Sequence, residues 1–228
     1  MPQGYSDMLL AGIGMTVRLS LASLAVAMLL GLAGAVAKLS GSLVLRGIAT
    51  LYTTVIRSIP DLAIMLLVFY SLQMGLNNAT DAFGWQQIDI NPFGAGVITL
   101  GFIYGAYFTE TFRGSIMAVP AGQMEAAKAF GMGGWQSFRL IMFPQMMRFA
   151  LPGLSNNWLI LVKATALVSI IGLSDITKAA QEVGKGSGQL FFYLVIAALF
   201  YLLVTSISGV VIALLSKRYE LGVREAGL

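Results

Sequence analysis

Five long apolar stretches follow one another along the chain, separated by shorter polar segments. A helix needs about 20 apolar residues to cross the roughly 30 Å hydrocarbon core of a bilayer, and each stretch reaches that length. The pattern therefore predicts an all-α membrane protein whose residues 1–228 form a single domain, with residues 5–17 in the membrane interface. We expect the five transmembrane helices near 18–37, 50–75, 94–117, 149–173 and 189–215.

Lysine and arginine are unevenly distributed between the connections that join these stretches. The second connection, residues 77–93, holds Asp81 and Asp89 but neither lysine nor arginine. Because cytoplasmic loops carry the excess of basic residues, we expect the first and third connections and the C-terminus in the cytoplasm. Five crossings then place the N-terminus on the outer side. The basic residues of the cytoplasmic segments are Lys38, Arg46, Arg113, Lys128, Arg139, Arg148, Lys217, Arg218 and Arg224.

Composition narrows the possible functions. Of the 228 residues 57% are apolar and only 11% are charged, whereas soluble domains carry about 25% charged residues. Cysteine and histidine are absent, so we expect neither a metal site nor a catalytic residue. The net charge of +4 comes from basic residues scattered along the chain. In a membrane protein such residues set the topology, so the charge does not indicate a nucleic-acid partner. No GxxxxGK[ST] loop is present, so the chain has no phosphate-binding loop of its own.

The third connection, near 118–147, is long and contains signals for a short helix outside the membrane. Pro120 suits a helix start, Glu125 favours the positive end of that helix, and Gly131 suits a C-terminal cap. We expect a helix from Ala121 to Phe130, with an apolar face. Such a helix either lies on the lipid surface or fills a groove on a cytoplasmic partner. The face is formed by Met124, Ala127 and Phe130, with Ala126 nearby.

The spacing of this connection resembles a known motif. Glu125-Ala126-Ala127 is followed after three residues by Gly131, after nine more by Ile141 and after two more by Pro144. This spacing is similar to the EAA loop of ATP-binding-cassette import permeases. At about 7% per fixed position, chance would give six matches on the order of once in ten million starts.

The resemblance extends over nearly the whole chain, to the polar amino-acid branch of that family and its histidine/lysine/arginine/ornithine subgroup. It rests on TTVIRSIPDLAIMLLVFY, IYGAYFTETFRGSIMAVPAGQMEAAKAFG and NNWLILVKATALVSIIGLSDI. It implies a type I importer permease in the bacterial inner membrane, with a periplasmic N-terminus and a cytoplasmic C-terminus.

The resemblance also implies a complex. A homologous membrane subunit, favoured over a second copy, would complete the pathway, and a periplasmic binding protein would deliver the amino acid. Two ATPase subunits would bind ATP and Mg²⁺, which this chain would not. Residues 125–131 would be the coupling helix, seated on an ATPase subunit. Glu125 would pair with a basic residue there or cap its own helix.

Charged residues within the apolar stretches are expensive, since insertion of Arg, Lys or Asp at a helix centre costs about 2.5–3.5 kcal/mol. Asp61 follows Pro60, which usually kinks a helix, and is our candidate for contact with a cationic substrate. The alternative is an ion pair with Arg57, four residues earlier on the same helix face.

Each of the other polar residues in the apolar stretches allows two interpretations of its role. We expect Glu110 in a structural or gating ion pair, with ligand contact as the alternative. Lys163 would pair with an acid of the bundle or, alternatively, with the substrate carboxylate. Asn156 and Asn157 are polar enough to line the pathway, with interhelical hydrogen bonds as the more ordinary alternative.

Three rival functions remain to be weighed. A carrier driven by an ion gradient would explain the buried acids, but five spans and the lack of internal repeats oppose it. A membrane scaffold or sensor would not require intramembrane charges. Within the resembling family, glutamine, glutamate or another polar amino acid is the closest alternative to a cationic substrate.

Overall fold

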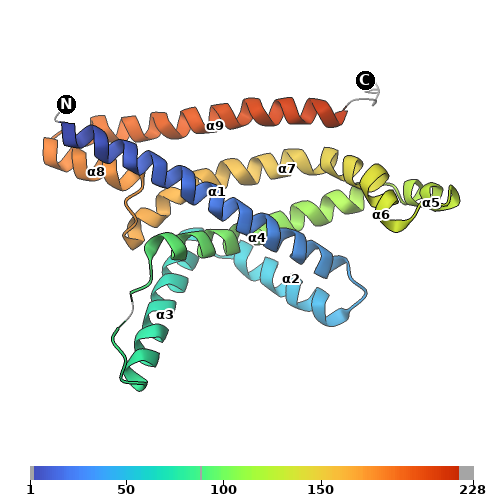
Figure 1. The fold of residues 1–228 in the computed structure, drawn as a ribbon, viewed down its shortest axis with the longest axis horizontal. Helices are drawn as coiled ribbons and strands as arrows, with labels where there is room; N and C mark the ends of the chain where they lie inside the picture. Colours follow the sequence, from blue (N-terminus) through green and yellow to red (C-terminus); the bar gives the residue numbers. More distant parts are fainter. Residues whose placement is uncertain (1–2, 88, 221–228) are drawn as a thin grey trace.

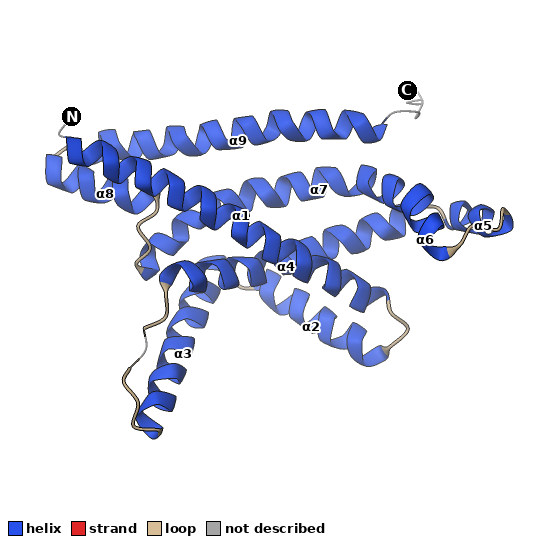
Figure 2. Cartoon of the chain, viewed as in Figure 1, coloured by secondary structure: helices blue, strands red, loops and turns tan. Residues whose placement is uncertain are grey.

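The computed structural model describes residues 3–87 and 89–220, and over these residues Figure 2 shows helices joined by loops, with no strand. Arg224 lies outside the described residues. Five described segments are long and apolar enough to cross a membrane: 4–39, 61–82, 92–118, 134–171 and 190–219. The elements in order are α1 (Gln3–Leu39), α2 (Leu43–Ser58), α3 (Asp61–Ala82), α4 (Pro92–Ala118), α5 (Ala121–Ala129), α6 (Gly134–Ser137), the π-helix η1 (Phe138–Met142), α7 (Phe143–Ala164), the 3-10 helix η2 (Thr165–Ile171), α8 (Ile176–Ser187) and α9 (Leu190–Glu220).

α4 forms the centre of the bundle and coincides with the third expected span. Its buried residues, among them Leu100, Tyr104 and Phe108, belong to the main hydrophobic core. α1 packs along it at very short range, because a Cβ added at Gly31 would lie 2.5 Å from the Cβ of Phe108. Small residues thus let these two helices approach more closely than larger side chains would permit.

The connections that are rich in basic residues gather at one end of the molecule. Figure 1 shows the α1–α2 connection, α5 and the end of α9 at this end, and the start of α1 with α8 at the other. This distribution is the one that the charge pattern predicts.

The second expected span, 50–75, is wrong as a continuous helix. α2 ends at Ser58 and α3 begins at Asp61, with Ile59 in extended conformation at φ −106° and ψ 140°. The residue before a proline is driven out of the α region by a clash with the proline ring, so Pro60 separates two helices instead of kinking one. α3 then projects away from the rest of the bundle (Figure 1).

The first span is also longer than expected. α1 begins at Gln3 and is unbroken to Leu39, so residues 5–17 continue the same helix and form no separate interfacial segment. The fourth expected span, 149–173, corresponds to most of α7 together with η2, which ends at Ile171 and is capped by Gly172 with φ +104°. The fifth, 189–215, corresponds to α9.

Candidate functional site

α5 forms a short arm beyond the end of α4. It starts after Pro120 and closes at Gly131, which has φ +72°. The N–H of Gly131 donates to the carbonyl of Lys128 at 2.9 Å, and that of Met132 donates to Ala127 at 3.0 Å. This pair of backbone hydrogen bonds is a Schellman cap, which requires a residue in the left-handed conformation and therefore favours glycine. The short helix and its glycine cap are present as the sequence predicts.

One side of α5 packs against the rest of the chain. Ala127 is only 3% exposed, and the Gln145 side chain of α7 donates to that of Gln123 at 3.3 Å. η1 packs against α5 and carries Ile141, while Pro144 lies in the first turn of α7; both are half-buried. Ala127, the Gln145–Gln123 hydrogen bond and the packing of η1 thus hold the arm against the bundle.

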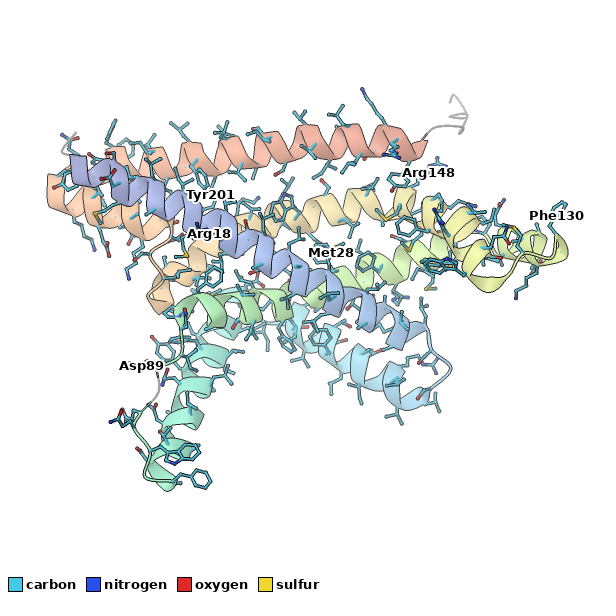
Figure 3. All side chains as sticks on the ribbon, viewed as in Figure 1. Arg18, Met28, Asp89, Phe130, Arg148 and Tyr201 are labelled. Atoms are coloured by element: carbon cyan, nitrogen blue, oxygen red, sulfur yellow. The ribbon has the colours of Figure 1, made fainter. Side chains whose placement is uncertain are left out.

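The other side of α5 is open. Glu125 and Ala126 are exposed, and Phe130 is 87% exposed; Figure 3 shows Phe130 at the tip of the molecule. The expected apolar face is therefore wrong in part, because Met124 and Ala127 turn inward. Glu125 also lies beyond the first turn and makes no capping bond at the helix start, so its cap role is not observed.

A buried charge cluster joins three helices. Glu110 of α4 forms an ion pair with Lys38 of α1 and accepts from the Arg113 Nε at 3.0 Å. The Lys38 ammonium also donates to the Thr53 hydroxyl of α2 at 2.7 Å. The side chains of Lys38 and Glu110 are 10% and 19% exposed. The ion pair expected for Glu110 is thus present, but Lys38, its partner 72 residues away, was assigned only a topological role.

Asp61 and Arg57 do not form the ion pair that their spacing suggests. No described salt bridge joins them within 4.0 Å. Asp61 instead accepts from the hydroxyl of Tyr104 at 2.8 Å, and the Arg57 guanidinium lies 5.3 Å from the ring centroid of Tyr107. Because Pro60 ends the helix between them, the i,i+4 geometry is lost. The two tyrosine rings stack with centroids 5.6 Å apart.

The polar residues of α7 divide between two faces. Asn157 is buried and donates to the Thr111 hydroxyl of α4 at 3.0 Å, which is the interhelical use. Asn156 and Lys163 are exposed. Among the described side chains, Lys163 forms no ion pair within 4.0 Å, so its expected pairing with an acid of the bundle is wrong within this chain.

Asp175 is a buried polar residue between η2 and α8 that the sequence analysis did not single out. It is fully buried, caps α8 by accepting from the N–H of Lys178 at 2.9 Å, and accepts from the hydroxyl of Tyr201 at 3.4 Å; Figure 3 labels Tyr201. Burial raises the pKa of the Asp175 carboxyl above its ordinary value, although these hydrogen bonds oppose the shift. A sequence signal existed, since Asp is a preferred N-cap residue.

The sequence that forms the α5 arm, the buried charges and the five apolar segments matches a family of transport proteins. Residues 13–221 match the family described as binding-protein-dependent transport system inner membrane component. The chain belongs to this family. As a member it is an inner-membrane permease, and the matched residues include every site residue described above.

Individual relatives place the permease more closely. It is 55% identical over 225 residues to the histidine/lysine/arginine/ornithine transport system permease protein HisQ of Salmonella typhimurium, and the match covers 99% of each chain. It is 51% identical, with the same coverage, to the HisQ protein of Escherichia coli. A solved amino acid ABC transporter with histidines matches at 31% identity and a TM-score of 0.78, over 94% of this chain and 95% of the other.

These similarities confirm that the chain is a permease subunit of an ATP-binding-cassette importer with the type I fold. A permease of such a system works with an ATPase and a binding protein. Which residues contact the substrate and the ATPase remains a prediction.

Proposed function

We propose that this permease forms one half of the membrane pathway of an importer for cationic amino acids, namely histidine, arginine, lysine and ornithine. The names of the two HisQ relatives support this substrate class. The observation that carries the proposal is that the carboxylate of Asp61 forms no ion pair with any described basic side chain, although it lies in a membrane protein.

Asp61 is suited to select a cation. It is the first residue of α3 and follows the break at Pro60, while the Tyr104 hydroxyl fixes one of its oxygens. At an effective dielectric near 20, a cation about 4 Å away gains roughly 4 kcal/mol before desolvation. A neutral side chain gains nothing comparable, so Asp61 favours lysine, ornithine and arginine. Arg57, close by on the ring of Tyr107, offers a cation for the substrate carboxylate.

α7 contributes further polar side chains to the proposed pathway. Asn156 and Lys163 are seven residues apart and share one face of the helix, and both are exposed. A lysine facing lipid at a helix centre would cost about 2.5–3.5 kcal/mol. This face therefore borders the aqueous pathway or the partner subunit that completes it, and Asn157 holds the helix against α4.

α5 supplies the coupling to ATP. Its exposed face, with Glu125, Ala126 and Phe130, fits a groove on the ATPase, where Glu125 meets a basic residue. Its opposite side is tied to α7 through Gln145, and only two residues separate it from α4. A displacement of the ATPase is thus transmitted to the helices that carry the pathway residues, which opens the site alternately to each side.

The complete importer in this proposal contains a homologous membrane subunit, two ATPase subunits and a periplasmic amino-acid-binding protein. ATP and Mg²⁺ bind to the ATPase subunits, and this chain binds no cofactor. The N-terminus is periplasmic and the C-terminus cytoplasmic, because the basic connections share one end of the molecule (Figure 1). Membrane lipid contacts the outer helices.

Uptake of labelled arginine and histidine at about pH 8, where the imidazole of histidine is neutral, by cells carrying Asp61→Asn tests the proposal. We expect arginine uptake to fall at least about tenfold, the equivalent of about 1.4 kcal/mol, and histidine uptake to change little. Asp81→Asn, an exposed acid at the other end of α3, is the matched control and should leave both unchanged. Equal losses for both substrates in Asp61→Asn would assign Asp61 a structural role and sink the selectivity argument.

A further inference from the structure

A groove of about 360 Å³ opens between α1, α7 and α9, with Phe108 of α4 among its lining residues. Its lining is almost entirely apolar. Ser155, Trp158 and Ser208 are its polar members, and the Trp158 N–H donates to the Ser208 hydroxyl at 2.9 Å. Such a surface offers little to a charged amino acid. The remaining lining residues are Leu24, Met28, Leu151, Leu154, Ile207, Val211, Ile212 and Leu215.

The groove lies away from the proposed pathway. At about 100° per residue, the groove residues of α7 lie roughly 140° around the helix from Asn156 and Lys163. All three of the long helices that border the groove are apolar enough to cross a membrane, so the surroundings that fill it are lipid or another membrane helix.

Basic residues stand at one end of the groove. α7 and α9 run antiparallel (Figure 1), and the Trp158–Ser208 bond fixes their register. Ten residues back from Trp158 is Arg148, and ten residues on from Ser208 is Arg218, so equal rise along both helices sets these arginines at the same level, about one turn beyond the groove residues Leu151 and Leu215. Lys217 lies beside them in the last turn of α9.

Two arginines at the same level of the bundle repel each other, and an anion near both is therefore favoured. None of these three cations forms an ion pair with a described side chain. Figure 3 shows Arg148 near the start of α7, at the same end of the molecule as the end of α9. Basic pockets between membrane helices are known to bind anionic lipid headgroups, and a phosphate accepts from arginine in a bidentate manner.

We propose that this groove binds one anionic phospholipid. An acyl chain occupies the apolar lining, and the phosphate accepts hydrogen bonds from Arg148 and Arg218, with Lys217 in support. The lipid thereby fills the space between α9 and α1 and neutralises the basic charges at this level of the bundle.

The test uses the complete importer in nanodiscs that contain phosphatidylglycerol or phosphatidylcholine with a photoreactive diazirine in the acyl chain. Labelled peptides are then mapped by mass spectrometry. We expect groove peptides to label on the order of 25 times more strongly from phosphatidylglycerol, since two arginines contribute about fivefold each. Arg148→Gln and Arg218→Gln should each reduce this preference about fivefold, as expected for about one surface charge.

Arg46→Gln is the matched control, because Arg46 is exposed near the start of α2, a helix that contributes no residue to this groove; it should leave the preference unchanged. Equal labelling by the two lipids would overturn the proposal, as would an equal effect of Arg46→Gln. Cross-linking of Ile212→Cys to the other membrane subunit, with no lipid label, would also overturn it and assign the groove to a partner helix.

Discussion

Replacement of Glu110 by Gln should destabilise the permease by removing the centre of the Lys38–Glu110–Arg113 cluster. The change keeps the side-chain shape but leaves two cations without their counter-charge. Breaking a fully buried pair costs about 3–5 kcal/mol. Because the Glu110 side chain is 19% exposed and Lys38 retains its bond to Thr53, we expect a loss of about 2–3 kcal/mol.

Lys38→Met should cost less, about 1–2 kcal/mol, since Glu110 keeps Arg113 as a partner at 3.0 Å. The double variant should then be more stable than the sum of the two losses implies, by about 1 kcal/mol. Arg113→Gln is the control, because this side chain is 35% exposed and exposed pairs contribute about 0–1 kcal/mol.

The assay is equilibrium unfolding of the purified permease in mixed detergent and SDS micelles, followed by tryptophan fluorescence. Transport by the same variants would show whether the clamp between α1, α2 and α4 is also needed for function. Equal losses for Glu110→Gln and Arg113→Gln, or single losses that simply add in the double variant, would refute the view that the cluster is a coupled, buried unit.

Four further outcomes follow from the structure. Gly31→Ala brings a Cβ to 2.5 Å from an atom of α4, so unfolding should become about 1–3 kcal/mol easier, whereas Gly14→Ala, with no neighbour within 4 Å, should not destabilise. Glu125→Lys should abolish co-purification of the ATPase and substrate uptake without changing membrane insertion, which membrane fractionation and pull-down would check; normal ATPase binding would contradict the coupling role. Gly131→Ala forces an L-residue to φ +72° and should lower transport through strain of about 1–2 kcal/mol; an unchanged rate would show that the cap is dispensable. Because burial raises the pKa of Asp175, the folded state retains its proton to higher pH than the unfolded chain does. Stability should therefore fall as pH rises through that window, and Asp175→Asn should remove this slope in thermal unfolding between pH 4 and 8 while keeping the cap.

Local sequence signals predicted the elements that depend on local physics. α4 and α9 follow directly from apolar length, and α5 follows from Pro120 and Gly131, whose left-handed conformation has a clear chemical reason. The motif spacing around Glu125 carried the family assignment, because it fixes residue identity at defined intervals.

Features that depend on distant contacts were missed or misjudged. Lys38 and Glu110 are 72 residues apart, and no periodicity links residues on different helices. The prediction of an Arg57–Asp61 ion pair was wrong for a related reason, since the i,i+4 rule holds only within one continuous helix and Pro60 ends α2. Lys163 lacks a partner among the described side chains because its face of α7 is exposed, where the pathway or another subunit would lie.

The most direct test is competitive uptake of labelled arginine, lysine, histidine, glutamine and leucine in cells with and without this gene, each with and without ATP depletion. We predict that loss of the gene removes ATP-dependent uptake of arginine, lysine and histidine and spares leucine and glutamine. Loss confined to glutamine would contradict the cationic substrate class. Gene-dependent uptake that survives ATP depletion and stops when the proton gradient is dissipated would contradict the ATP-driven mechanism itself.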